Sequence, residues 1–116
     1  MNTFADIKIR LVGLPKISLN DWYGGKHWSY RKKMKDAYKL LVKFQTKAFF
    51  RKELEYEVIY KFGFKSRPLD AMNTTAIAKI VEDILFEDDK WNIVRSVKLS
   101  SEKSKEDVLE ITVKVI

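Results

Sequence analysis

The chain contains no cysteine, two prolines, four glycines and a single histidine, His27. Without cysteine, disulfides, thiolate zinc sites and a cysteine nucleophile are all excluded. One histidine excludes multi-histidine metal sites, and we expect His27 to be a loop residue rather than a catalytic one. The sequence also lacks a P-loop, a dinucleotide-binding glycine pattern and an HExxH motif. These absences leave carboxylates as the candidate metal ligands.

Long hydrophobic runs are missing as well, since no apolar segment approaches the ~20 residues that a membrane span needs. Residues 1–10 carry Asp6, Lys8 and Arg10 within their apolar pattern, so we expect no signal peptide and a cytoplasmic protein. The 116 residues contain no repeats and no Gly/Ser-rich linkers, and we expect a single domain over residues 1–116.

Positive charge is abundant and unevenly distributed. The net charge is +7, but residues 1–67 hold 16 Lys/Arg against 6 Asp/Glu, whereas residues 68–116 hold 7 against 10. A basic surface attracts phosphate backbones independently of sequence. The composition is therefore compatible with nucleic-acid binding, although a basic protein need not bind nucleic acid.

Apolar periodicity and turn residues predict an α+β fold, a small mixed β-sheet with two helices packed on it, in the order β-α-β-α-β-β. The pattern predicts strands over 4–11, 54–64, 91–99 and 108–115, helices over 29–50 and 73–85, a loop over 17–26 and a polar hairpin loop over 100–107. Asn73 stands where it would cap the first turn of the second helix.

The first predicted helix carries an apolar stripe and a row of lysines. The apolar residues at spacings of three and four are Met34, Ala37, Leu41, Phe44 and Ala48, and the lysines opposite are Lys32, Lys35, Lys39, Lys43 and Lys47. Asp36 is the exception in a row that otherwise lacks acidic partners. The row is either a solvated helix face or a ridge of phosphate contacts, and the sequence leaves both open.

Six of the 16 acidic residues lie in one window, from Asp70 to Asp89. Lys79 and Asp83 share one face of the second predicted helix, and Asp88 and Asp89 follow that helix. If the strand before Asp70 lies next to the strand after Asp89, the helix would return Asp88 and Asp89 towards Asp70. Converging carboxylates need a cation between them, and Mg²⁺ or Mn²⁺ fits oxygen ligands. We expect Glu82 and Glu87, in the same window, to be surface residues.

Each of these carboxylates also has a purely structural interpretation. Asp70 would cap the helix, Asp83 would pair with Lys79 at four-residue spacing, and Asp88 with Asp89 would shape a turn. The set as a whole, within an otherwise basic protein, favours the metal site.

The stretch from Arg67 to Asn73, followed by Lys79, Asp83 and Asp88-Asp89, resembles RusA-type Holliday-junction resolvases. The segment from Leu19 to Tyr23 and the following His27-Trp28 are similar to the N-terminal part of phage members. The resemblance covers roughly residues 15–116. It implies a RusA-like fold, a homodimer encoded by a bacterium, phage or prophage, and Mg²⁺-dependent cleavage of four-way DNA junctions in recombination and repair.

By this resemblance Asp70 and Asp89 are catalytic metal ligands, with Asp88 beside them and Asp83 as a supporting carboxylate. Lys79 would lie near the scissile phosphate, and Asn73 would be structural or support the ligands. The residues expected to grip DNA backbones are Lys26, Arg31, Lys32, Lys35, Lys39, Lys43, Lys47 and Arg67.

One position departs from the family pattern, because Met72 stands where a second acid of the motif is expected, and a thioether is a poor ligand for Mg²⁺. The sequence therefore admits two functions within this class. The first is a structure-selective, Mg²⁺-dependent endonuclease, and the second is a catalytically silent protein that binds DNA junctions. A basic RNA-binding domain is a third, more distant alternative.

Overall fold

A computed structural model describes residues 6–24 and 28–116 as four strands, three α-helices and one 3-10 turn. In chain order they are β1 (Ile7–Val12), α1 (Leu19–Tyr23), α2 (Trp28–Gln45), β2 (Tyr56–Phe64), η1 (Ala71–Thr74), α3 (Thr75–Leu85), β3 (Val94–Lys103) and β4 (Val108–Val115). The predicted α+β class is confirmed.

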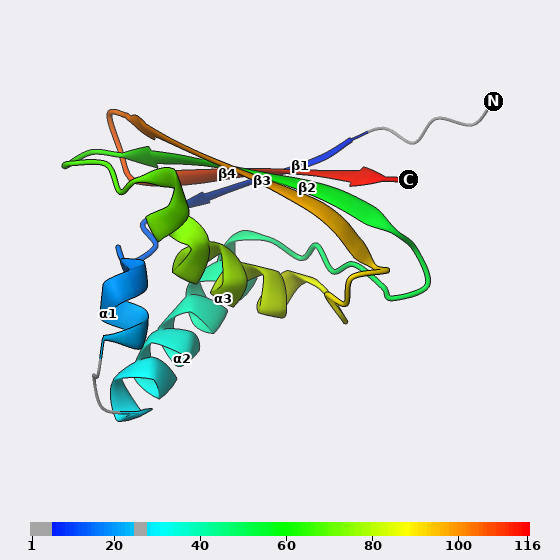
Figure 1. The fold of residues 1–116 in the computed structure, drawn as a ribbon, viewed down its shortest axis with the longest axis horizontal. Coiled ribbons are helices and arrows are strands. Elements are labelled where there is room, and N and C mark those ends of the chain that lie inside the picture. Colours follow the sequence, from blue (N-terminus) through cyan, green and yellow to red (C-terminus); the bar gives the residue numbers. More distant parts are fainter. Residues whose placement is uncertain (1–5, 25–27) are drawn as a thin grey trace.

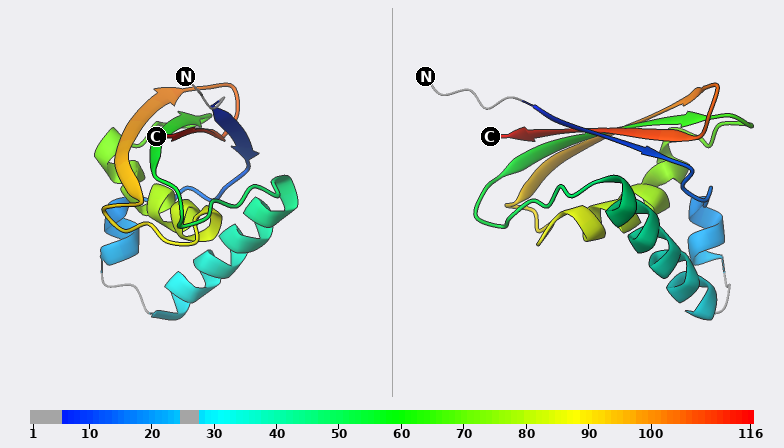
Figure 2. Two further views of the ribbon diagram at one scale, coloured as in Figure 1. Left: turned by 90° about the vertical axis from the view of Figure 1, so that its right-hand side faces the viewer. Right: turned by 180° about the vertical axis from the view of Figure 1, so that it is seen from behind.

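The strands form one mixed sheet in the order β1-β4-β2-β3. β4 pairs antiparallel with both β1 and β2, and the edge strand β3 pairs parallel with β2. Parallel strands need a crossover, and here η1 and α3 supply it. All the helices lie on one side of the sheet, as Figures 1 and 2 show from three directions.

The core lies between the sheet and the helices. Alternate side chains of β2 point towards the helices and are almost fully buried, for example Tyr56, Val58 and Tyr60. α3 contributes buried residues on nearly every side, whereas α2 buries fully only Tyr38 and Val42. α3 is therefore the central helix of the fold, and α2 packs outside it (Figure 1).

The predicted loop over 17–26 is wrong over its central part, which forms α1. Ser18 and Asp21 make a reciprocal capping box, in which the Asp21 N–H donates to Ser18 Oγ at 3.0 Å and the Ser18 N–H donates to Asp21 Oδ2 at 3.2 Å. Trp22, buried beneath this turn, fixes it to the rest of the protein. Residues 25–27, with Lys26 and His27, lie outside the described residues.

α2 ends at Gln45, five residues before the predicted end, because the chain must leave the helix for Phe50 to pair with Phe86. Its core face is also rotated relative to the predicted stripe. Phe44 is 89% exposed, and the buried positions are Tyr38 and Val42 instead. Phe44, which belongs to the predicted apolar stripe, therefore lies outside the core, because α3 packs against the neighbouring flank of α2.

The remaining predicted elements are present with shifted ends. β2 and β4 agree closely with the prediction, and the first strand is described from Ile7, so Phe4 lies outside the described residues. β3 runs from Val94 to Lys103, which shortens the hairpin loop to residues 104–107. Asn73 does not cap α3, because it lies within η1, and Thr74 is the N-cap residue. No helix in the described part of the chain is long and apolar enough to cross a membrane.

Candidate functional site

The turn after α3 is held in place by an aromatic cluster. Phe86 stacks on Phe50 with ring centroids 4.8 Å apart, and Tyr56 meets Phe86 edge-on at 5.3 Å. Two backbone bonds tie the same segments together, since the Phe50 N–H donates to the Leu85 carbonyl at 2.8 Å and the Glu87 N–H donates to the Phe50 carbonyl at 2.9 Å. These contacts fix the path of the chain into Asp88 and Asp89.

Lys79 is the centre of a cluster of charged side chains at this turn. Its Nζ lies 2.5 Å from Asp89 Oδ2 and 3.2 Å from Asp83 Oδ1. Glu82, one turn from Lys79 on α3, is the fourth member, and the Tyr60 hydroxyl donates to its Oε1 at 2.8 Å. We call Lys79, Glu82, Asp83 and Asp89 the Lys79 cluster. The prediction that Lys79 and Asp83 project together is confirmed.

The cluster perturbs the ionisation of its members. The hydrogen bond from Lys79 lowers the pKa of Asp89. Partial burial works against the charged form of Lys79, but the bonds to Asp89 and Asp83 outweigh it and raise the pKa of Lys79. Burial raises the pKa of Glu82 to about 7, although the bond from Tyr60 acts in the opposite direction. Asp89 is thus held as a carboxylate at neutral pH, while Glu82 lies near its titration point.

Glu82 was wrongly expected at the surface, since it is only 8% exposed. Its position among Val81, Leu85 and Ala78 on a helix buried nearly all round is the signal that sequence reasoning missed. Glu87 is exposed, as expected.

Asp70 does not join the Lys79 cluster within one chain. β3 does lie beside β2, which was the condition for the expected return, but the two strands are parallel, so the end of β2 and the start of β3 are at opposite ends of the sheet. Asp70 precedes η1, whereas Asp88 and Asp89 follow α3, whose 11 residues span about 16 Å. The expected return of Asp88 and Asp89 towards Asp70 is therefore wrong for the single chain (Figure 1).

The remaining two predicted metal ligands, Asp70 and Asp88, make contacts with nearby backbone groups. The Asp70 side chain makes no capping hydrogen bond, while its carbonyl accepts the Asn73 N–H at 2.8 Å. Asp88 Oδ1 accepts the Lys90 N–H at 3.1 Å, and its other oxygen lies 3.6 Å from Lys90 Nζ. Asp88 thus shapes the turn, and its oxygens contact Lys90. Met72, where the resemblance implies a second acid, is 73% exposed.

Of the four predicted metal ligands, two lie close enough together near Lys79 to bind one divalent ion, namely Asp83 and Asp89. No three His, Asp or Glu side chains within residues 6–24 and 28–116 are grouped to hold one metal ion. Asp83 and Asp89, however, both contact a single cation, the Lys79 ammonium. Mg²⁺ is usually held by one or two carboxylates, with water and phosphate completing its shell. Asp83 and Asp89 would therefore hold such an ion.

The predicted row of lysines is exposed, and part of it adjoins the Lys79 cluster. Lys32, Lys35, Lys39 and Lys43 follow one another at spacings of three and four along α2, and we call them the basic flank. Among them, Lys32 pairs with Asp36 at 2.9 Å. A cleft of about 280 Å³ between α2 and α3 is lined by Lys35, Asp36 and Lys39 on one side and by Ile80, Asp83 and Ile84 on the other. The basic flank thus lies across this cleft from Asp83 of the Lys79 cluster.

The other predicted DNA-binding residues are placed differently. The Arg31 guanidinium lies between two aromatic rings, 5.8 Å from the centre of Trp22 and 5.5 Å from that of Tyr23, and its buried Nε has no hydrogen-bond partner. Lys47 lies beyond the end of α2 and is exposed, as is Arg67 in the connection between β2 and η1. Lys26 lies outside the described residues.

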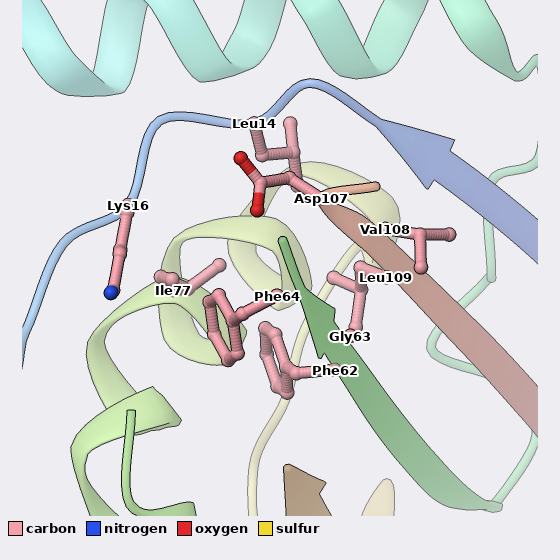
Figure 3. Close-up of a pocket in the computed structure, with 9 residues that line it drawn as sticks. All are labelled: Leu14, Lys16, Phe62, Gly63, Phe64, Ile77, Asp107, Val108 and Leu109. Atoms are coloured by element: carbon pink, nitrogen blue, oxygen red, sulfur yellow. The ribbon is translucent and has the colours of Figure 1, made fainter. Parts of the chain in front are cut away.

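A separate small pocket opens near the carboxyl end of β2 (Figure 3). Phe62 and Phe64 form its wall, with their ring centroids 6.1 Å apart, and Lys16 Nζ lies 5.5 Å from the centre of the Phe64 ring. Its cavity of about 20 Å³ has room for about one water molecule. This pocket is too small to be the functional site.

Comparisons of the chain with protein-family models, with curated proteins and with solved structures found no match.

Proposed function

We propose that the protein binds branched DNA and cleaves its backbone as a structure-selective, Mg²⁺-dependent endonuclease of the RusA type. The observation that carries the proposal is the cleft between α2 and α3, in which Lys35 and Lys39 face Asp83 of the Lys79 cluster. A nuclease needs cations that hold the backbone next to carboxylates that serve the chemistry, and this arrangement supplies both side by side.

In this proposal the lysines of the basic flank hold backbone phosphates, and Lys79 turns its ammonium towards the scissile phosphate. Asp83 and Asp89 keep Lys79 protonated and orient it. The same two carboxylates would hold a divalent ion once the Lys79 ammonium has moved from them to the phosphate, and that ion would supply an activated water and stabilise negative charge on the phosphate. The overall reaction adds one water across a P–O bond of the backbone.

A homodimer is part of the proposal, and the flank of α2 opposite the basic flank supports it. Ala37, Leu40, Leu41 and Phe44 form an apolar strip at helical spacing, here called the α2 strip, and Leu40 and Phe44 are 76% and 89% exposed. Two α2 helices that meet through this strip would bury it while each basic flank stays free for DNA. A two-fold dimer would match the symmetry of a four-way junction.

The second candidate is a silent junction-binding protein, which Met72 and the separation of Asp70 from Asp89 favour. Nicking of a labelled synthetic four-way junction in Mg²⁺ or Mn²⁺ separates the two. We expect the wild type to nick and Asp89→Asn to reduce the rate on the order of 100-fold or more. Asp70→Asn tests the role that the resemblance gives to Asp70, and Asp6→Asn is the matched control far from the cluster.

Binding is measured on the same junction by fluorescence anisotropy over a range of salt concentrations. The double variant Lys35→Ala/Lys39→Ala should lower the salt slope by about two phosphate contacts, whereas Lys98→Ala/Lys105→Ala, with the same change in charge, should not. Binding without nicking in either metal would select the silent protein. Tighter binding to structured RNA than to junction DNA would refute both candidates.

A further inference from the structure

A second groove lies on the opposite side of Lys79 from the cleft between the helices. It has a volume of about 310 Å³ and runs between α3 and the edge strand β3. Val97 and Leu99 of β3 form one side, Tyr60 of β2 lies beside them, and Thr75, Ala78, Lys79 and Glu82 of α3 form the other side. We call it the β3 groove.

The β3 groove exists because α3 covers β2 and leaves the edge strand partly open. Val97 is the register partner of Val58, so both side chains point to the helix side of the sheet, but Val58 is 1% exposed and Val97 is 47% exposed. Likewise Tyr60 is fully buried, whereas its partner Leu99 is half-buried. Ala78, with its small side chain, leaves the space open on the helix side.

Lys79 belongs both to the β3 groove and to the Lys79 cluster. A nucleotide whose phosphate meets the Lys79 ammonium would therefore have an apolar groove within reach of its base. On its helix side the groove carries the Lys79 ammonium, the Thr75 hydroxyl and the Glu82 carboxyl, which accepts the Tyr60 hydroxyl, while Ala78, Val97 and Leu99 supply its apolar surface. Apolar walls suit the flat faces of a base, and polar atoms at the rim suit its edge.

We propose that the β3 groove binds an unpaired nucleobase next to the cleaved phosphate. Taking a base out of a duplex costs stacking and pairing energy, and this cost is lowest where the base is already unpaired. A site of this kind would favour branch points over uninterrupted duplex. The inference rests on the proposed function, because it takes Lys79 as the phosphate contact.

The test uses a four-way junction with an unpaired 2-aminopurine at the branch point, in EDTA so that the DNA stays intact. 2-Aminopurine is quenched by stacking, so its transfer into the β3 groove should raise its fluorescence several-fold as protein is added to saturation. Val97→Phe fills the groove from an exposed position, and Ser96→Phe places the same side chain on the opposite face of β3.

We expect the wild type and Ser96→Phe to give the rise, and Val97→Phe to lose it while anisotropy reports unchanged affinity for the junction. Saturated binding by the wild type without a rise, or a full rise with Val97→Phe, would overturn the inference and leave the proposed function standing. Absence of junction binding by the wild type would overturn both.

Discussion

At the scale of single residues, Glu82 is the most unusual group in the described protein. It is a carboxyl buried on the central helix, with the Tyr60 hydroxyl as its hydrogen-bond donor. Burial raises its pKa from 4.5 to about 7. In the unfolded chain the same group would lose its proton near its ordinary pKa, so folding and protonation of Glu82 are linked.

This linkage predicts that stability falls as the pH rises from about 4.5 to about 7 and then levels off, because the folded protein holds a proton that the unfolded chain has lost. Glu82→Gln removes the titration and should flatten this slope, with a gain of about 3 kcal/mol at most at pH 8. Urea unfolding between pH 4 and pH 8 in EDTA measures the effect. Glu110→Gln, on the exposed face of the sheet, is the control, and an equal slope in Glu82→Gln would contradict the assignment.

At the scale of elements, the end of α2 is tied to the end of β1 by one side chain. The Val12 N–H donates to Gln45 Oε1 at 2.7 Å, and Gln45 Nε2 donates to the Val12 carbonyl at 2.9 Å. The Gln45 side-chain amide therefore satisfies both backbone groups of Val12, as a neighbouring strand would. This contact helps to determine where α2 ends. The angle at which α2 presents its basic flank depends on this contact.

Gln45→Ala should destabilise the protein by about 1–3 kcal/mol, since both backbone groups of Val12 lose a partly buried partner. Chemical denaturation measures this directly. Lys43→Ala, an exposed position on the same helix, should stay within about 0.5 kcal/mol of the wild type. If Gln45→Ala were as stable as Lys43→Ala, water would be an equally good partner for Val12.

The sequence predicted most elements of the fold because their apolar periods are long and regular, as in β2 and α3. It failed where a tertiary contact decided the outcome. Phe50 leaves α2 to meet Phe86, and α3 rotates the core face of α2 away from Phe44. The sequence does contain the capping-box residues of α1, Ser18 and Asp21. The turn-forming residues around them favoured a loop instead.

The candidate site was predicted in part for the same reason. Lys79 and Asp83 share a helix face, so local geometry was enough to pair them. Bringing Asp89 to Lys79 depends on the turn after α3, and excluding Asp70 depends on the direction in which β3 runs beside β2. Neither fact follows from spacing along the chain.

At the scale of the whole molecule, the protein carries its charge and its exposed apolar surface on different flanks of α2. The basic flank faces the cleft with α3, and the α2 strip faces away from it. Under the proposed function, one flank of the helix would serve DNA binding and the other self-association, with the exposed Lys33, one turn before Ala37, at the end of the α2 strip.

We therefore expect the protein to sediment as a dimer and Phe44→Asp to sediment as a monomer, because the substitution places two carboxylates in a contact that depends on apolar burial. Analytical ultracentrifugation at several protein concentrations measures this. Leu54→Asp introduces an aspartate at an exposed leucine outside α2 and should remain dimeric. A dimer of unchanged strength in Phe44→Asp would place the interface elsewhere.

The two outer strands of the sheet, β1 and β3, also bear on how the protein behaves at high concentration. An unpaired strand edge is a template on which another chain can add as a further strand, the first step towards fibres. Here Lys8 on β1 and Lys98 on β3 are exposed cations, while Arg10 and Arg95 on the same strands pair with Glu106 and Glu55. A second molecule that approached either edge in register would bring like charges together. We therefore expect these basic residues to oppose edge-to-edge aggregation.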